Sequence, residues 1–447
     1  MANHSFRSRP STAIAAVVLM VSLSAWLLYA GSDHEGPRVV AALQAPGSQS
    51  ATSSASSPSS PGERTIRIDR APVRTLQDPN AAYSAVAVDA TRNEIVLQDE
   101  NRSTIMVYDR LDNTPATATM TEPKRMIGGR KTKITNNCGV YIDPANGDIY
   151  SLTGDIADTM VIFSHESKGN VPPERELKTP HRTYGVAADE QTQELFLTIQ
   201  HPPAILVYRK TAQGKEAPIR ILEGEKTQLG DVHGIAVDTK NQVMYVANRG
   251  AASDVQKGKD FAGVPKSADG NPRNWAVPAI WYEYFRDRMV PGSGRFAAPS
   301  ITAYPLKAEG DTPPLRVIQG SKTQLDWPAH IHLDVQHQEL FIANAMDDSI
   351  LVFRTTDNGN VAPARILKGP KTGLKQPHGV FVDEKNQEIV VANFGNHAAT
   401  VYPRTADGDT PPIRKIRSAP EGTVAPMFGN VGSLAYDTKR DQILAPN

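Results

Sequence analysis

A short phrase, Pro-x-Arg-x-(Ile or Leu), recurs seven times along this chain of 447 residues and constrains its fold more than any other feature. A second phrase, an apolar segment that ends in Asp, also occurs seven times and alternates with the first. Such an alternation, with a period of about 50 residues, indicates a repeat architecture. The Pro-x-Arg phrases cover residues 72–76, 123–127, 173–177, 218–222, 314–318, 363–367 and 412–416. We call the aspartates that end the apolar segments the marker aspartates: Asp89, Asp143, Asp189, Asp238, Asp334, Asp383 and Asp437.

Each repeat contains four short segments with the character of β-strands. In the clearest repeat they are residues 234–238, 243–248, 300–304 and 314–318. The first is a short, bounded apolar run that is typical of a buried strand, and the last begins with Pro, which suits an edge strand. Four strands in a meander, with few helical patterns elsewhere, predict one blade of a β-propeller.

The two ends of the repeat region predict how the propeller closes. The C-terminal unit, which contains Asp437, has the first two strands of a blade, whereas residues 65–68 and 72–76 have the character of third and fourth strands. Joined, these halves make one blade, and this closure removes open strand edges. Because both phrases count to seven, the sequence favours seven blades over six. The predicted fold is therefore all-β, a seven-bladed β-propeller over residues 63–447 with an N-terminal transmembrane helix.

The N-terminus carries a membrane signal. Arg7 and Arg9 precede an uncharged, apolar stretch at residues 11–30, which is long enough to cross a bilayer as a helix. Residues 1–30 are predicted to be either an uncleaved signal anchor or a cleaved signal peptide, and both alternatives export the rest of the chain. Residues 31–62, rich in Ser, Pro and Ala, are predicted to be a disordered linker.

Composition excludes some partners. Lys plus Arg and Asp plus Glu both number 48, so the formal net charge is zero. Nucleic acid is therefore not expected as a partner, because phosphate binding requires a basic surface. Cys138 is the one cysteine of the sequence, so no intrachain disulfide can form.

Several strands resemble known bacterial repeats. Residues 245–248 (YVAN), 341–344 (FIAN) and 390–393 (VVAN) are similar to the second strand of YVTN-type propeller repeats. Residues 233–238 and 377–383 resemble NHL repeats. The resemblance implies a bacterial β-propeller over the whole exported domain. Together with the N-terminal signal, this predicts a protein in the periplasm or at the cell exterior, anchored to the inner membrane, or secreted if the signal is cleaved. It does not imply an activity, because one fold supports many functions.

Three histidines form the predicted metal site. His233, His330 and His378 come from successive repeats near the start of the innermost strand, where their rings could converge on zinc or calcium. In the hydroxyglycine-lyase branch of NHL-type propellers, histidines in similar motifs bind a metal. His330 departs from that pattern, because Ala329 occupies the matching position. The alternative is that His before Gly is a structural feature of the repeat, and no cofactor is certain.

A long insertion forms the predicted binding surface. Residues 249–299 interrupt the fourth full repeat where the sixth has a connection of about seven residues, and loops this long are usually functional or disordered. Aromatic and arginine side chains are typical of contact surfaces. The insertion is expected to be a lid, a docking arm or a segment anchored on the propeller. Its candidate binding residues are Trp275, Trp281, Tyr282, Tyr284, Arg286 and Arg288.

Other recurring features are interpreted as structural. Gly224-Glu-Lys-Thr and its two relatives lack the full phosphate-loop spacing. The Pro-x-Arg arginines are expected to make an ion pair or a carbonyl contact between blades, and the marker aspartates are expected to cap turns. No residue set identifies a nucleophile or an acid–base pair, so catalytic residues are unknown.

The sequence therefore predicts a membrane-tethered, extracytoplasmic propeller. It would bind a small-molecule ligand or a protein on its top face, the face where first strands begin and second strands end. Contact with the membrane would be through the N-terminal helix only. The alternative is a metal-dependent lyase or hydrolase, lactonase-like or hydroxyglycine-lyase-like, with a histidine-bound metal at the central channel.

Overall fold

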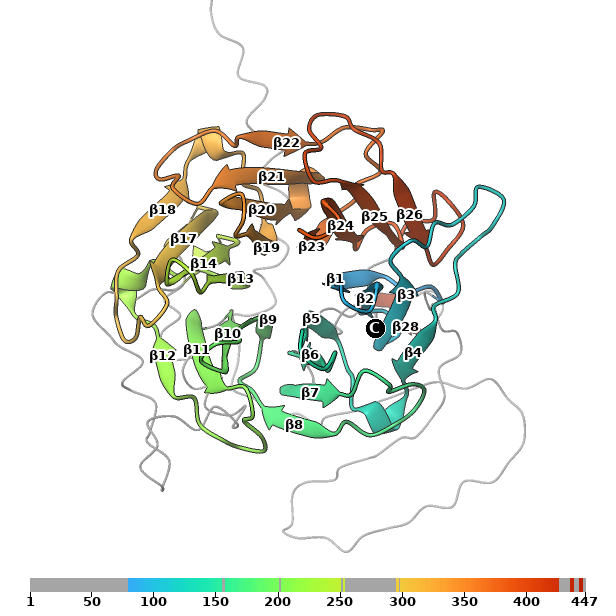
Figure 1. The fold of residues 1–447 in the computed structure, drawn as a ribbon, viewed down its shortest axis with the longest axis horizontal. Coiled ribbons are helices and arrows are strands. Elements are labelled where there is room, and N and C mark those ends of the chain that lie inside the picture. Colours follow the sequence, from blue (N-terminus) through green and yellow to red (C-terminus); the bar gives the residue numbers. More distant parts are fainter. Residues whose placement is uncertain are drawn as a thin grey trace, which may run out of the picture. The chain divides into compact units, whose positions relative to one another are not determined.

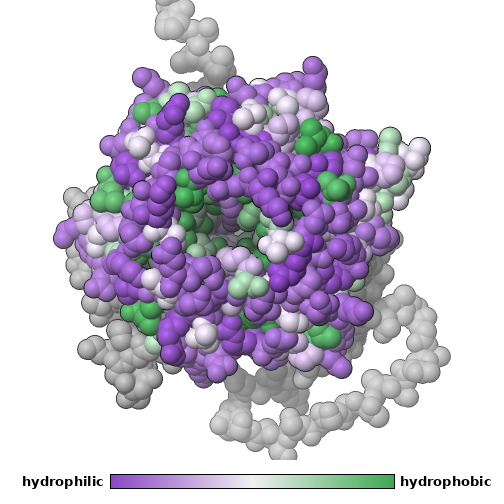
Figure 2. Space-filling view, viewed as in Figure 1, coloured by the Kyte–Doolittle hydropathy of each residue, from purple (hydrophilic) through white to green (hydrophobic). Residues whose placement is uncertain are grey.

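The computed structural model describes residues 79–154, 157–200, 202–250, 298–425 and four short strand segments beyond them. Six four-stranded antiparallel sheets stand around a central channel, as Figure 1 shows. Each sheet is one blade, and we number the blades 1 to 6 in chain order. Seen from the same side, the surface is mostly hydrophilic and is hollowed at the centre of the ring (Figure 2). The described chain is therefore an all-β propeller, as the repeats predict.

Every blade is a simple meander in which each strand pairs with the next. The strands of blades 1 to 3 are β1 (Tyr83–Asp89), β2 (Glu94–Asp99), β3 (Thr104–Asp109), β4 (Arg125–Gly128), β5 (Asn137–Ile142), β6 (Ile149–Thr153), β7 (Thr159–Phe163), β8 (Arg175–Lys178), β9 (Thr183–Asp189), β10 (Glu194–Ile199), β11 (Ala204–Arg209) and β12 (Arg220–Leu222). Short 3-10 turns follow two of the outer strands, η1 (Arg130–Thr132) and η2 (Glu225–Thr227).

The second half of the ring repeats this order. The strands of blades 4 to 6 are β13 (Val232–Asp238), β14 (Val243–Asn248), β17 (Ser300–Pro305), β18 (Arg316–Gln319), β19 (Pro328–Asp334), β20 (Glu339–Asn344), β21 (Ser349–Arg354), β22 (Arg365–Leu367), β23 (Pro377–Asp383), β24 (Glu388–Asn393), β25 (Ala398–Pro403) and β26 (Arg414–Arg417). The remaining elements are η4 (Ser321–Thr323), η5 (Ala345–Asp347) and two strand pairs, β15 (Ala252–Ser253) with β16 (Arg295–Phe296) and β27 (Ala435–Asp437) with β28 (Gln442–Leu444).

Six clusters of buried apolar side chains fill the spaces between neighbouring blades. Second strands are buried on both faces, as in β2, where Ile95, Val96 and Leu97 are at most 1% exposed. This explains why second strands read as continuous apolar runs rather than alternating ones. Each fully buried side chain of this size contributes about 1.5–3 kcal/mol, so the interfaces supply most of the stability of the ring.

The marker aspartates cap the turn between first and second strands, as predicted. The Oδ1 atom of Asp238 accepts a hydrogen bond of 2.9 Å from the backbone N–H of Asn241. Asp334 and Asp383 make the same contact, at 2.9 and 3.0 Å. An aspartate at this point satisfies the turn backbone and ends the strand.

Four of the six described arginines of the Pro-x-Arg phrases bind a carboxylate of their own blade. Arg220 donates hydrogen bonds of 2.7 and 2.9 Å to the two oxygens of Glu194, the first residue of β10. The pairs Arg125 with Glu94 and Arg365 with Glu339 have the same two-pronged geometry. Such bidentate pairs fix both the position and the orientation of the outer strand.

The same glutamates also bind a cation from the following blade. Lys307 of blade 4 donates to Glu194 of blade 3 at 2.7 Å, and Arg404 of blade 6 donates to Glu339 of blade 5 at 2.7 Å. One carboxylate therefore joins cations from two blades. This carboxylate makes the contact between blades, whereas the sequence predicts that the arginine makes it.

The other two described arginines of the Pro-x-Arg phrases bind no carboxylate of their own blade. Arg175 instead donates to the backbone carbonyls of Lys210 and Ala212 in the next blade, and so makes the predicted carbonyl contact between blades. Arg316 donates to the Tyr245 hydroxyl of its own blade.

The phosphate-loop fragments are structural turns, as predicted. In η2, η4 and the turn at residues 369–372, a Thr hydroxyl donates to the carbonyl of the preceding Gly, at 2.6 or 2.7 Å. Gly224 has φ of +125°, and a Cβ atom there would lie 2.4 Å from Asp311 of the next blade. Glycine is therefore required at this position, because any side chain would collide with the neighbouring blade.

The predicted count of seven blades is wrong, because blade 6 contacts blade 1 directly. Arg110 of blade 1 donates to Glu388 of blade 6 at 2.8 Å, which repeats the contact that joins blades 3 and 4 and blades 5 and 6. The backbone N–H groups of Thr114 and Thr121 donate to carbonyls of β26, at 2.7 and 2.9 Å. One apolar cluster also joins the two blades. We call each contact surface between two neighbouring blades a joint. The ring has six joints, and no space for a further blade remains between blades 6 and 1.

The phrases that suggested a seventh blade are the one at residues 72–76 and the one that ends in Asp437. Asp437 ends β27, which pairs only with β28 among the described residues. Residues 65–68 and 72–76, the proposed partners of this pair, lie outside the described residues. A repeated phrase thus marks a repeat unit, but it does not show that the unit takes part in the ring.

The predicted transmembrane helix is not supported. In the ranges that the structure describes, no helix has the length and apolar character needed to cross a membrane. Residues 11–30, which carry the predicted span, lie outside those ranges, as does the linker at residues 31–62.

Removal of residues 426–447 tests the six-blade closure. We expect a chain that ends at residue 425 to unfold as cooperatively as the full chain, with a midpoint within about 3 °C, because all six joints are retained. A chain that ends at residue 410 is the control, since it lacks β26 and should lose the cooperative transition. Calorimetry of the three proteins measures this, and a broad or multi-step transition in the 425-residue chain would contradict the six-blade closure.

The Glu194 pair should make stability depend on pH. Hydrogen bonds from Arg220 lower the pKa of Glu194 from 4.5 to about 2, although burial opposes this shift. Because the folded pKa is the lower one, the stabilisation is complete above pH 4.5 and is lost as the pH falls toward 2. We expect Glu194→Gln to lower the free energy of unfolding by about 1–3 kcal/mol at pH 7, with a difference that shrinks in acid. Urea unfolding of both proteins measures this difference in the free energy of unfolding.

The matched control is Glu166→Gln, because the Glu166 side chain is 91% exposed and should change stability little. A difference between the Glu194 variant and the parent protein that is as large at pH 2 as at pH 7 would contradict the assignment.

Candidate functional site

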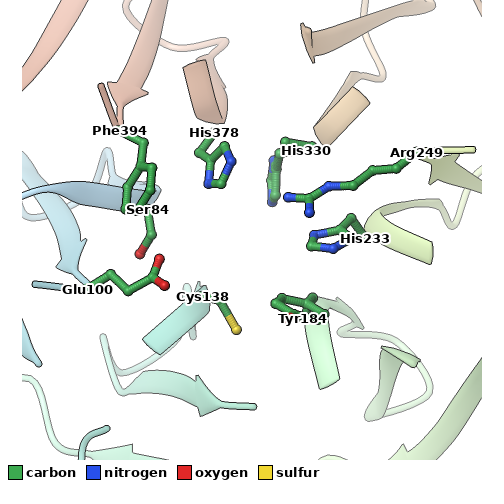
Figure 3. Close-up of a pocket in the computed structure, with 10 residues that line it drawn as sticks. Ser84, Glu100, Cys138, Tyr184, His233, Arg249, His330, His378 and Phe394 are labelled. Carbon is green, nitrogen blue, oxygen red and sulfur yellow. The ribbon is translucent and has the colours of Figure 1, made fainter. Parts of the chain in front are cut away.

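A cavity of about 130 Å³ lies at the top-face end of the channel. It is built by side chains from all six blades, which Figure 3 shows around a common centre. The lining residues are Ser84, Glu100, Cys138, Tyr184, His233, Arg249, Ala329, His330, His378 and Phe394.

Six of these residues occupy one equivalent position, five residues before each marker aspartate. We call these the mouth positions: Ser84, Cys138, Tyr184, His233, Ala329 and His378. Each is the second residue of a first strand, and in blades 1, 2, 5 and 6 the pairing register shifts around it. A bulge at this point turns the side chain out of the strand pattern and toward the channel. The repeat therefore delivers one side chain from each blade to the same ring.

The next position along the strand keeps the inner strands close together. It is Gly in four blades, and a Cβ atom on Gly234 would lie 2.8 Å from the Cα atom of His330 in the next blade. Blade 5 reverses the order, with the small Ala329 at the mouth position and His330 after it. His330 still lines the cavity, so the offset does not remove its ring from the site.

Three further lining residues lie eleven residues after a marker aspartate, where second strands end. We call these the rim positions: Glu100, Gly154, Gln200, Arg249, Ala345 and Phe394. Their backbone is held to the residue that precedes the first strand of the same blade, as in the 3.0 Å bond from Arg249 N–H to the Asp231 carbonyl. Glu100 and Phe394 make the equivalent 3.0 Å bonds to Ala82 and Gln376. These backbone hydrogen bonds fix the rim residues at the ends of the second strands, around the mouth of the channel.

Arg249 is a buried cation. Its exposure is 8%, and its guanidinium carbon lies 4.5 Å from the centre of the Trp327 ring, a cation–π contact. Within the described residues Arg249 forms no ion pair, and its Nε atom is buried without a hydrogen-bond partner. Burial lowers the pKa of Arg249 to about 10, with Asp231 opposing the shift, so the group stays charged at neutral pH. A buried charge that forms no direct ion pair is costly, even with Asp231 and Glu100 acting on it at longer range, and this favours binding of an anion.

The neighbouring imidazoles are neutral at physiological pH. Burial lowers the pKa of His330 to about 4, against a backbone hydrogen bond with Val380. Burial, together with the positive charge of Arg249 and the ring of His330, lowers the pKa of His378 to about 3. His332 lies further along β19, and burial also lowers its pKa to about 3. Neutral imidazoles supply hydrogen-bond donors and acceptors without adding charge to the site.

Flat aromatic surfaces flank the cavity. The rings of Tyr184 and His233 stack with centres 4.0 Å apart, and those of His378 and Phe394 stack at 4.8 Å with an angle of 4°. Figure 3 shows Phe394, Ser84 and Glu100 on one side of the cavity and Arg249, His330 and His233 on the other. The site thus has an acidic side with an aromatic ring and a basic side with imidazoles.

The three predicted metal ligands line one cavity, but metal binding remains a prediction. Among the described residues, no group of three or more His, Cys, Asp or Glu side chains is placed to hold a metal ion. The nearby Arg249 charge also opposes a second cation, because like charges at close range repel strongly in a low dielectric.

The predicted binding residues of the insertion, Trp275, Trp281, Tyr282, Tyr284, Arg286 and Arg288, lie outside the described residues. The structure does describe the pairing of β15 with β16, which joins the two ends of the insertion shortly after Arg249.

Sequence reasoning missed Arg249, Glu100, Tyr184 and Phe394. The signal for all four was present, because aligning the repeats on the marker aspartates gives two columns, five residues before and eleven after. In these columns the side chains differ in size, charge and chemistry, whereas the column after the first is mostly Gly and the column before the second is mostly Asn or Thr. Attention to the histidines alone identified only part of the column that lies five residues before the marker aspartates.

The fold and the cavity define a six-bladed β-propeller with a polar site at the mouth of its channel. No protein-family model matches the chain and no curated protein matches it, so the NHL and YVTN resemblance is not confirmed. Among solved structures, a chain described as Kuenenia stuttgartiensis hydrazine synthase aligns with a TM-score of 0.47 and 11% identity. The alignment covers 75% of this chain and 99% of that chain. A likeness of this degree carries no argument about ligand or activity.

The neutral imidazoles can be tested by NMR. In protein labelled with 15N histidine, we expect the ring nitrogens of His330 and His378 to keep the pattern of neutral imidazole from pH 8 down to pH 5, because their pKa values are about 4 and 3. The variants His330→Gln and His378→Gln assign the signals. A titration midpoint above pH 6 for either ring would contradict the burial argument.

Proposed function

We propose that the protein binds a small ligand with an anionic group in the cavity at the mouth of the channel. β-Propellers commonly serve as scaffolds that bind ligands or proteins through the centre of the ring. The observation that carries the proposal is Arg249, a buried cation that forms no ion pair among the described residues. An anionic ligand would supply the direct ion pair that these residues do not provide.

The surroundings of Arg249 support a binding role. Trp327 holds one face of the guanidinium, so its N–H edges remain for a planar acceptor such as a carboxylate or a phosphate. His330 lines the same cavity, and its Nδ1 atom is buried without a hydrogen-bond partner in the described part of the chain. A ligand in the cavity would satisfy both groups, which otherwise carry the cost of unpaired burial.

The other sequence-based hypotheses remain predictions. A docking surface for a protein on the top face would depend on the insertion. The metal-dependent lyase or hydrolase would depend on a histidine-bound ion. Location outside the cytoplasm depends on residues 1–30, and the NHL and YVTN relationship depends on the strand motifs alone.

Substitution of Arg249 tests the proposal. We expect wild-type protein to bind at least one probe anion among acetate, propionate, phosphate and sulfate, and Arg249→Met to weaken that binding at least about tenfold. Arg249→Lys should retain part of the affinity, because it keeps the charge but loses the planar donors. Calorimetry or ligand-observed NMR measures the binding.

The matched control is Arg354→Met at the exposed end of β21, which should bind the probe like the wild type. The melting temperature separates binding from folding. Loss of an uncompensated buried charge should leave stability unchanged or raise it. A large loss of stability in Arg249→Met, without any anion binding in the wild type, would instead assign Arg249 a purely structural role.

A further inference from the structure

We propose that the ligand at the channel mouth is a small zwitterion of the amino-acid class, with its carboxylate at Arg249 and its ammonium group at Glu100. This inference deepens the proposed function and rests on it, because the anionic group is the carboxylate of the same ligand. It adds a second charged contact, on the opposite side of the cavity.

The repeat places the two charges opposite one another. Glu100 and Arg249 both occupy rim positions, Glu100 in blade 1 and Arg249 in blade 4. In a ring of six blades, equivalent positions three blades apart face each other across the channel. Figure 3 shows the carboxylate and the guanidinium pointing into the cavity from opposite sides. A ligand that fills the cavity therefore meets an acid at one end and a base at the other.

The charges of the lining favour a ligand without net charge. Glu100 and Arg249 carry opposite charges, and the imidazoles of His330 and His378 are neutral. An anion bound at Arg249 would face the Glu100 carboxylate in a cavity of low dielectric, and like charges there repel. A zwitterion replaces that repulsion with a second attractive contact. The Glu100 carboxylate has several lone pairs, so it can accept ligand N–H groups together with its contacts to the protein.

The size and surface of the cavity fit the same class. Its volume is about 130 Å³. A protein cavity of about 150 Å³ accommodates benzene, so this slightly smaller one suits a ligand of about six non-hydrogen atoms. Phe394 stands on the acidic side with Glu100, where its ring can face an ammonium group. On the basic side, the imidazole of His330 can contact the carboxylate beside Arg249. Alanine and serine have the required size and both charged groups.

Three probes that differ in their charged groups test the inference. L-Alanine carries both charges, propionate lacks the ammonium group, and ethylamine lacks the carboxylate. We expect wild-type protein to bind L-alanine at least about tenfold more tightly than either of the other two, because each lacks one charge-assisted contact. Titration calorimetry or competition NMR with the full chain measures the affinities at millimolar concentrations.

Variants of Glu100 separate recognition from folding. Glu100→Gln should weaken L-alanine binding at least about tenfold, to the level of propionate, while propionate binds equally well or better. Glu100→Asp, which keeps the charge, should retain part of the preference for L-alanine. Arg249→Met should weaken L-alanine and propionate together. Equal melting temperatures for the Glu100 variants and the wild type show that the ring is intact.

The outcomes distinguish the two proposals. If propionate or phosphate binds through Arg249 but L-alanine, glycine and L-serine bind no better, the zwitterion inference is overturned and the anion site stands. The same holds if Glu100→Gln weakens propionate and L-alanine to the same degree, since Glu100 would then act on the structure of the site. If no anion and no zwitterion binds, both proposals fail.

Discussion

A glutamate at the start of the second strand makes the contact on which the ring depends. Glu194 accepts two hydrogen bonds from Arg220 of its own blade and one from Lys307 of the next. Because one anion binds cations from two blades, the outer strand of a blade and the body of its neighbour are fixed together. The contact between Arg110 and Glu388 closes the circle in the same way. The positions of the first strands, and hence of the side chains at the channel mouth, follow from this fixed ring.

Local patterns predicted the blade but not the number of blades. The Pro-x-Arg phrases and the marker aspartates each have a role within one repeat, at the outer strand and at the first turn, so they could be read from the sequence. Closure depends instead on contacts between residues that are distant in the chain, such as Arg110 and Glu388. No local sequence pattern predicts that two such distant residues are in contact. Counting seven phrases therefore counted repeat units, of which six form the ring.

Only part of the candidate site could be predicted from the sequence, because the rest of it depends on contacts that form in the folded ring. Histidines attract attention because of their metal chemistry, and His233, His330 and His378 do line one cavity. Arg249 looked like an ordinary charged residue at the start of a long insertion. Its importance comes from burial and from the lack of an ion pair among the described residues, which are properties of the folded ring. The variation at the rim and mouth positions can be seen when the repeats are aligned. That these positions line a site can be inferred only when it is known which strand ends face the channel.

The joint between blades 4 and 5 differs from the others and has a consequence for the cavity. Val243 stands where blades 1, 3, 5 and 6 have the bridging glutamate, and a neutral hydrogen bond of 3.2 Å from the Asn241 amide to the Gln338 side-chain oxygen joins the two blades instead. Neutral hydrogen bonds of this kind are insensitive to salt and to protonation of carboxylates, whereas the ionic joints weaken in acid. Blades 4 and 5 carry Arg249 and His330. When acid or salt begins to loosen the circle, the split should therefore start at another joint, and these two side chains should separate late.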